Sequence, residues 1–291
     1  MTQHATQPTP QPMRHELRNR YVFKGKLEMR TGLHIGGGKA TLSYTDSPVV
    51  MTPDDLPFIP GSSFKGTLRS MIEQFVASLP SELGLHSCGL PVGEHPEESC
   101  PTARQKQIAN NPDTKEAERM NLCHTCQLFG SPFAAARITV NDLYLIDNEW
   151  SGTTQIRDGV AIDRDSETAK SGAKYDFEVV PSTTAFRLHL VIENATEQDL
   201  QLICIGLSEF TNGFGTVGGF RWRGLGACIL KDLEIRSMEL HGLDETKRKQ
   251  RLLRYLLRNK DVQDDGLDSL DTDTFFKEHI NTLFQQPSSG R

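Results

Sequence analysis

The chain has 291 residues, 36% of them hydrophobic, which is enough to build the core of one large domain or two small ones. No apolar run approaches the roughly 18 residues of a membrane span, and residues 1–13 are polar and proline-rich, so we predict a soluble, cytoplasmic protein with no signal peptide and no membrane partner. The net charge of -6 argues against nucleic-acid binding by charge alone, but basic residues cluster in 14–30 and 221–236 and acidic residues in 261–273.

A strand and a glycine loop are predicted at the start of the fold. Residues 21–30 alternate apolar and charged side chains, which is typical of a half-buried strand. Three glycines follow, and Gly36 and Gly37 would let the backbone approach a ligand closely. The loop is not a Walker phosphate loop, because Lys39 is followed by Ala40, and no helix follows directly as a Rossmann loop requires. A tight structural turn and a backbone-amide cradle for phosphate both remain as interpretations.

A helix with two cations follows the glycine loop. The prolines within residues 48–60 forbid a helix there, so we expect Ser62 or Ser63 to cap a helix that begins just after them. Lys65 and Arg69 lie one turn apart on this helix, where they could bind phosphate together with the amides of the helix start. An ordinary solvated helix face is the alternative.

Four of the six cysteines form a candidate metal site. They are Cys88, Cys100, Cys123 and Cys126. The last two form a CxxC pair, which is typical of a tetrahedral structural Zn²⁺ site, and three histidines are possible substitute ligands: His86, His95 and His124. A redox pair or ordinary buried thiols are the alternatives. Residues 84–126 show little apolar periodicity, so a metal ion would stabilise an insertion without a core of its own. Cys204 and Cys228 fit apolar patterns and are expected in the core.

The second half of the chain completes an alternating order of strands and helices. Strands are predicted at residues 137–146, 186–192 and 227–235, and Thr196 with Asp199 resembles a capping box that opens a helix. The resulting β-α-β, β-α-β order predicts an α+β, ferredoxin-like fold with long insertions.

A second glycine-rich loop carries a candidate nucleic-acid surface. Residues 213–226 contain Arg221, Trp222 and Arg223 among glycines. Cations contact phosphates and an aromatic ring stacks on a base, which is a combination suited to single-stranded nucleic acid. Taken alone, Trp222 would more often belong to a core.

Four segments together carry a family resemblance. GLHIGGG, TDSPVV and PFIPGSSFKGTLRS, closed much later by GFGTVGGFRWRGLG, closely resemble the RAMP superfamily and, within it, the Cas-seven type backbone subunits of type III CRISPR effector complexes. The resemblance implies a modified ferredoxin-like, RRM-related palm over residues 14–236. It implies as partners a CRISPR guide RNA, its target RNA, other CRISPR effector subunits and copies of the same chain. The Csm/Cmr-type backbone subunits cleave target RNA, so the resemblance also implies a metal-dependent endoribonuclease.

The resemblance identifies Asp46 as the catalytic residue. RNA carries its own nucleophile, the 2′-hydroxyl, so one carboxylate could act by holding Mg²⁺ or Mn²⁺ near the phosphate or by accepting the hydroxyl proton. Asp46 could instead cap a turn ahead of Pro48, which would leave Asp163 and Asp165 as reserve metal ligands. The implied RNA-binding residues come from the two glycine loops, the first helix and the hairpin described next: His34, Gly36, Gly37, Ser62, Ser63, Lys65, Arg69, Arg157, Arg164, Arg221 and Arg223.

The resemblance also divides the chain into parts. Residues 150–182 resemble a thumb hairpin that wedges into the guide–target duplex, and residues 84–126 a zinc-binding insertion. We expect residues 1–13 to be disordered and residues 237–291 to form a helical extension with an acidic, partly disordered tail; a basic helix at 246–260 would dock on a neighbouring subunit. Two other functions stay open: a backbone subunit that binds guide and target without cutting, and a stand-alone RNA-processing endonuclease, which the absence of a His-rich cluster disfavours.

Overall fold

The computed structural model describes residues 16–38, 45–89, 100, 122–132, 134–146, 150, 152–257 and 266–285. The disordered tail expected at residues 1–13, together with Lys39, His95 and most of the insertion at 84–126, lies outside the described residues. Within the described part of the chain, no helix is both long and apolar enough to cross a bilayer.

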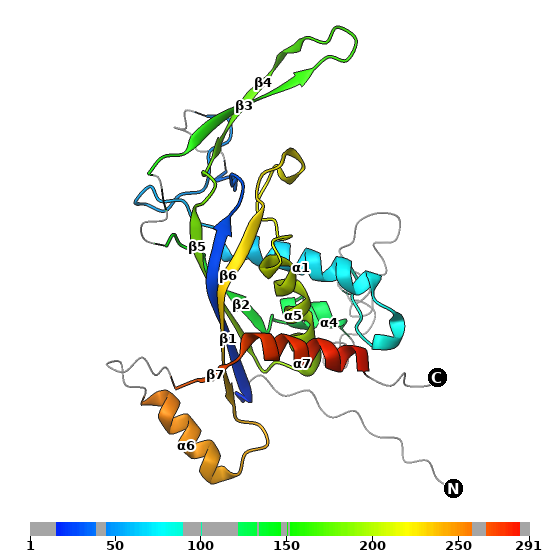
Figure 1. Cartoon of the computed structure of the whole chain (residues 1–291), viewed down its shortest axis with the longest axis vertical. Coiled ribbons are helices and arrows are strands. Elements are labelled where there is room, and N and C mark those ends of the chain that lie inside the picture. The colour runs from blue at the N-terminus through cyan, green and yellow to red at the C-terminus, as the bar shows by residue number, and fades with distance from the viewer. Residues whose placement is uncertain are drawn as a thin grey trace.

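The centre of the fold is a five-stranded antiparallel sheet with the strand order β2-β5-β1-β6-β7 (Figure 1). Its strands are β1 (Asn19–Met29), β2 (Ile138–Val140), β5 (Ala185–Glu193), β6 (Cys228–Glu239) and β7 (Asp268–Leu270). β1 lies in the middle and pairs with both β5 and β6. Without the hairpin and the short helical segments, the chain order of the palm is β1-helix-β2-β5-helix-β6, which is the βαββαβ order of a ferredoxin-like fold. The predicted α+β class is therefore confirmed.

Three helices cover one face of this sheet: α1 (Gly61–Ser78), α5 (Glu197–Thr211) and α7 (Thr272–Gln285) (Figure 1). The rings of Phe64 in α1 and Phe210 in α5 are fully buried, with their centroids 4.9 Å apart. Gly206 allows this close approach, because a Cβ atom there would lie 2.7 Å from side-chain carbons of Ile72 and Leu68. The shorter helical segments are η1 (Ser81–Leu83), α4 (His124–Phe129) and η4 (Arg221–Arg223).

The two long palm helices begin in different ways. At α5, Thr196 and Asp199 form the predicted capping box, so that expectation is confirmed. At α1, the prediction of a serine cap is wrong, because the N-cap residue is Pro60 and no side-chain cap bond forms there. Instead, the Gly61 N–H donates to Asp142 Oδ1 at 2.7 Å, so the cap comes from a residue beyond β2.

The strand expected at residues 137–146 is shorter than predicted. β2 covers three residues, after which Leu143 and Leu145 form isolated bridges to Ile59 and Phe186. Beyond β2, the chain therefore pairs first with the residues just before α1 and then with β5.

The C-terminal extension is largely part of the palm. β7 pairs with β6, and α7 adds buried Phe275 and Leu283 to the helix layer. α6 (Glu245–Leu256) lies on the other side of β7 (Figure 1), where Leu252 and Tyr255 pack on a small second cluster that includes buried Met238. The sequence interpretation included the basic helix but missed both β7 and α7.

A two-stranded hairpin of β3 (Gln155–Ile162) and β4 (Ala169–Val179) extends away from the palm (Figure 1). Three apolar residues of β3 are exposed: Ile156 at the root end, Val160 further along and Ile162 near the tip. The root of β4 is different, because Phe177 and Val179 are buried against the palm. The hairpin is thus anchored at one end and free to meet a partner at the other.

Candidate active site and cysteine centre

Asp46 belongs to a short segment held between the first glycine loop and the hairpin root. On one side, the Gly37 N–H donates to the Pro48 carbonyl at 3.0 Å, and the Val50 N–H to the Ile35 carbonyl at 2.8 Å. On the other side, the Glu178 N–H donates to the Ser47 carbonyl at 3.0 Å. Isolated bridges therefore join the segment to the glycine loop and to β4, and Asp46 is exposed at its end.

Asp46 lies against a second carboxylate, that of Asp176 in β4. The Asp46 N–H donates to Asp176 Oδ1 at 2.6 Å, and the Asp176 N–H donates to Asp46 Oδ2 at 3.1 Å. Oxygen atoms of carboxylates are the ligands that Mg²⁺ and Mn²⁺ prefer, so the exposed Asp46 carboxylate fits one ligand position of a divalent cation. The sequence interpretation missed Asp176, which is 130 positions from Asp46 and carries no local signal.

His34 lies beneath this segment and is 4% exposed. Its Nδ1 is 2.7 Å from the Glu178 carbonyl oxygen, which can only accept, so Nδ1 carries the proton. The other ring nitrogen, Nε2, is then the acceptor for the Ser47 hydroxyl at 3.3 Å. His34 therefore supports the segment from below in this structure, and its predicted contact with RNA stays a prediction.

The second glycine loop closes over His34. The Gly219 N–H donates to the His34 carbonyl oxygen at 2.8 Å. Gly218 has a φ of +89°, and a Cβ atom there would lie 2.4 Å from the same oxygen. Glycine is therefore required at this position both for its backbone conformation and for the space it leaves.

The turn η4 of this loop presents aromatic and basic groups on the surface. The Phe220 ring packs on Phe177 with a centroid distance of 4.5 Å, and the Arg223 guanidinium lies 5.3 Å above the Tyr175 ring. Trp222 is 101% exposed, so the alternative that it belongs to a core is excluded. Arg221 and Arg223 are also exposed, and the contact with Tyr175 places Arg223 beside the hairpin.

The remaining predicted contacts of the loops and hairpin are on the surface. Gly36 and Gly37 are exposed, as are Arg157 in β3 and Arg164 in the turn that follows it. In that turn, the Asp163 carboxylate accepts the N–H groups of the two residues after Arg164, which lowers its pKa and indicates a structural turn.

Lys65 and Arg69 have their polar atoms engaged within the protein. Lys65 Nζ donates to the Ile138 carbonyl at 3.0 Å, and burial, together with the neighbouring Arg69, lowers the pKa of Lys65. Arg69 pairs with Glu73 at 2.7 Å and donates to the Gly130 carbonyl at 3.2 Å. Their contact with guide phosphates, and that of Ser62 and Ser63 at the helix start, stays a prediction.

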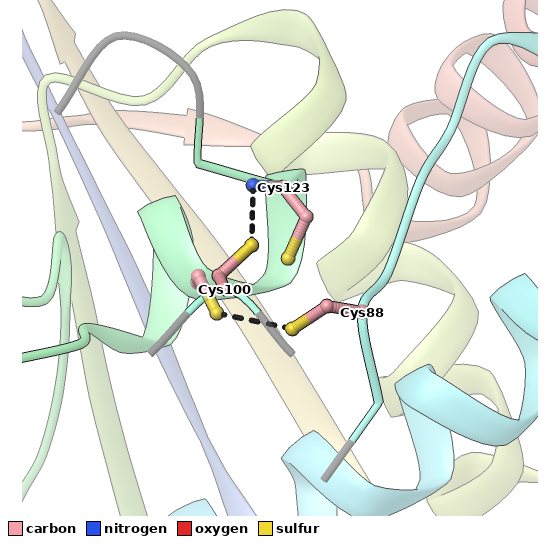
Figure 2. Close-up of side chains that lie close together, drawn as sticks. Cys88, Cys100 and Cys123 are labelled. Carbon is pink, nitrogen blue, oxygen red and sulfur yellow. Dashed lines mark hydrogen bonds between the residues drawn. The ribbon is translucent and has the colours of Figure 1, made fainter. Parts of the chain in front are cut away.

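The four predicted cysteines come together beside α1. The sulfur atoms of Cys88, Cys100, Cys123 and Cys126 all lie within 4.8 Å of one another. Figure 2 shows the sulfurs of Cys88, Cys100 and Cys123 directed toward one another, with the Cys123 N–H donating to Cys100 Sγ at 3.4 Å. The four side chains could therefore hold one metal ion. Cys204 and Cys228 are buried elsewhere, as predicted for core residues.

The surroundings of this cysteine centre favour the thiolate at Cys123, while hydrogen bonds from Cys100 and Cys123 raise the pKa values of Cys88 and Cys126. Hydrogen bonds from Cys100 and Cys126 lower the pKa of the Cys123 thiol below its usual range. Arg69 brings a positive charge to the centre, since one of its guanidinium nitrogens lies 3.5 Å from Cys126 Sγ. A thiolate ligand set of this kind is typical of structural zinc and excludes hard ions such as Mg²⁺.

Comparison with known proteins agrees with this arrangement. The RAMP superfamily matches residues 26–229. Three similar proteins are each named CRISPR system Cms endoribonuclease Csm3. The one from Enterococcus italicus is 27% identical over 205 residues, with 69% of this chain and 85% of the relative covered. Those from Methanothermobacter thermautotrophicus and Methanocaldococcus jannaschii are each 26% identical, covering 75% and 80% of this chain and 86% and 88% of the relatives. The superfamily match includes both glycine loops, the cysteines and the hairpin, and it ends within β6.

Proposed function

Because the chain belongs to the RAMP superfamily, we propose that it is a backbone subunit of a type III CRISPR interference complex and cuts target RNA paired to a guide RNA. The names of its similar proteins support this proposal, since each is a CRISPR endoribonuclease. The observation that carries it is the exposed Asp46, held between the glycine loop and the hairpin root. Such a subunit would work in the cytoplasm with copies of itself and with other effector subunits.

RNA binding would use the surface around the hairpin root. Arg221 and Arg223 can contact phosphates, and the exposed Trp222 ring can stack on an unpaired base. Gly36 and Gly37 let the RNA backbone approach the loop, while arginines on the hairpin follow the duplex. Lys65 and Arg69 add positive potential near the start of α1, which attracts the guide phosphates even while their side chains keep internal partners. Sequence specificity would come from base pairing between guide and target.

Cleavage needs few protein groups because RNA supplies the nucleophile. The 2′-oxygen attacks the adjacent phosphorus, the bond to the 5′-oxygen breaks and that oxygen takes a proton from water, so the products are a 2′,3′-cyclic phosphate and a 5′-hydroxyl. Asp46 would accept the 2′-hydroxyl proton or hold a divalent cation beside the phosphate. A bound Mg²⁺ or Mn²⁺ would neutralise charge that develops on the phosphate oxygens. The hydrogen bond from the Ser47 hydroxyl to His34 would keep the segment in place.

The cysteine centre would bind structural Zn²⁺. In a tetrahedral site with Zn–S bonds of about 2.3 Å, the sulfur atoms lie about 3.8 Å apart. Cys88 Sγ and Cys126 Sγ are 3.6 Å apart, which is close to that spacing. The ion would fasten the insertion to α1, since Arg69 of α1 reaches Cys126.

The proposed activity is tested by an Asp46→Ala variant assembled with guide RNA and the other subunits. We expect target binding to be unchanged and metal-dependent cutting to fall by about 10² to 10⁴-fold. Asp54→Ala is the matched control, since Asp54 is an exposed acid of the same loop and should have no effect. If Asp46→Ala cuts at the normal rate, the catalytic assignment is wrong and the chain is a binding subunit only.

A further inference from the structure

Asp176 has no role in the function proposed so far, yet it is the residue that holds Asp46. We propose that Asp176 is a positioning residue of the active site, whose carboxylate fixes the backbone of Asp46 and thereby the direction in which the Asp46 carboxylate faces the target RNA. This inference rests on the proposed function and adds a second residue, from the hairpin, to the site.

The two residues hold each other by a reciprocal pair of hydrogen bonds. Each backbone N–H donates to the carboxylate of the other residue, at 2.6 Å from Asp46 and 3.1 Å from Asp176. Among the described residues, the Asp176 carboxylate is the sole acceptor for the Asp46 N–H. Hydrogen bonds to an ionised acceptor are stronger than those between neutral groups, so this contact restricts the Asp46 backbone more than an ordinary turn would.

The neighbouring contacts fix the segment after Asp46 but not Asp46 itself. The Glu178 N–H binds the Ser47 carbonyl, and the Val49 N–H donates to Glu178 Oε2 at 3.0 Å. β4 thus holds the segment by hydrogen bonds with Glu178 and Asp176, and the bonds with Asp176 are those at the Asp46 end. Loss of the Asp176 acceptor would therefore free the Asp46 N–H and loosen its backbone, while the Asp176 N–H can still donate to the Asp46 carboxylate and Ser47 and Val49 stay in place.

In this geometry, the side chain at position 176 must supply a hydrogen-bond acceptor for the Asp46 N–H, but it need not be charged. An asparagine side chain has the same length as aspartate and keeps one carbonyl oxygen that can accept the Asp46 N–H. Alanine has no acceptor, and the serine hydroxyl is too short to reach. A displacement of about 1 Å at a reacting group costs on the order of 10²-fold in rate, so the three variants should separate clearly.

The experiment uses the assembled complex with guide RNA and measures two quantities for each variant: the Kd for target RNA and the single-turnover cleavage rate at saturating target. We expect Asp176→Ala and Asp176→Ser to slow cleavage roughly 10- to 100-fold with an unchanged Kd, and Asp176→Asn to stay within about threefold of the unmodified protein. Asp158→Ala is the matched control: Asp158 lies opposite Asp176 on β3 with its carboxylate toward Lys174, and this variant should cut normally.

The results distinguish the positioning role of Asp176 from the proposed function of the chain. If Asp176→Ala cuts at the normal rate while Asp46→Ala is inactive, the positioning role is refuted and the proposed function stands. If Asp176→Asn is as slow as Asp176→Ala, the negative charge itself is needed and positioning by an acceptor is refuted. If Asp46→Ala cuts normally, the proposed function fails, and this inference fails with it.

Discussion

Replacing Phe275 by alanine should lower the free energy of unfolding by about 3 to 4 kcal/mol. Phe275 of α7 is 6% exposed, and its ring centroid lies 5.9 Å from that of Tyr21 and 6.0 Å from that of Phe23 in β1. Burial of the side chain contributes about 2 to 3 kcal/mol, and the lost ring contacts add about 1 kcal/mol. The sum lies within the range measured for Phe→Ala changes in protein cores, about 3 to 5 kcal/mol.

The assay is urea unfolding of the purified chain followed by far-ultraviolet circular dichroism. We expect a lower midpoint with an unchanged dependence on urea concentration, since the same surface is exposed on unfolding. Phe284→Ala is the matched control, because Phe284 lies on the same helix and is 57% exposed; it should cost less than about 0.5 kcal/mol. Equal losses in the two variants would refute the packing of α7 on the palm.

Three further predictions concern the metal, pH and the second glycine loop. Cys88→Ser should lower the zinc content of the purified chain and its melting temperature, because three thiolates hold the ion less tightly than four. In the folded chain, burial and Lys24 lower the pKa of His189. Below about pH 6.5 the unfolded chain therefore binds more protons than the folded chain, and acid favours unfolding. His189→Gln removes this group, so the free energy of unfolding should fall less steeply as the pH is lowered. Gly218→Ala should slow target cleavage at least about tenfold, because the new methyl group displaces His34 from beneath the Asp46 segment.

The cysteine and glycine predictions each have a matched control within the chain. Cys204→Ser removes a buried thiol outside the cysteine centre and should leave the zinc content unchanged. Gly224 has a φ of +81° and open space around its Cβ position, so Gly224→Ala has the same backbone strain without the contact to His34. Equal cleavage by the two glycine variants would contradict the role given to Gly218, and an unchanged acid limb in His189→Gln would contradict the role of that histidine.

The local patterns of the sequence were sufficient for the central part of the fold. Alternation in residues 21–30 and 186–192 predicts β1 and β5, since a sheet with one buried face requires a period of two. The capping box at Thr196 predicts the start of α5 because all its partners lie within four residues. α1 could be located but not its cap, since the acceptor for the Gly61 N–H comes from a distant part of the chain.

Features that depend on distant partners escaped the sequence analysis. β7 has three residues with no apolar alternation, and it is a strand because β6 offers a free edge. Phe275 and Leu283 are eight positions apart, a helical spacing that was obscured by the acidic residues around them. Asp176 looks like any charged residue of a hairpin, and its importance arises only when folding brings it to Asp46. The cysteine centre could be predicted from the sequence, because cysteine ligands are recognised by their residue type and their spacing.

The cysteine centre has a practical consequence for experiments on larger assemblies. It brings Cys100 and Cys123 together beside α1, although they are 23 positions apart in the sequence. The entropy of closing a flexible loop grows only with the logarithm of its length, and doubling it costs about 0.6 kcal/mol. Lengthening the sequence between these two cysteines with a fluorescent or affinity tag should therefore add little to the free energy of bringing them together.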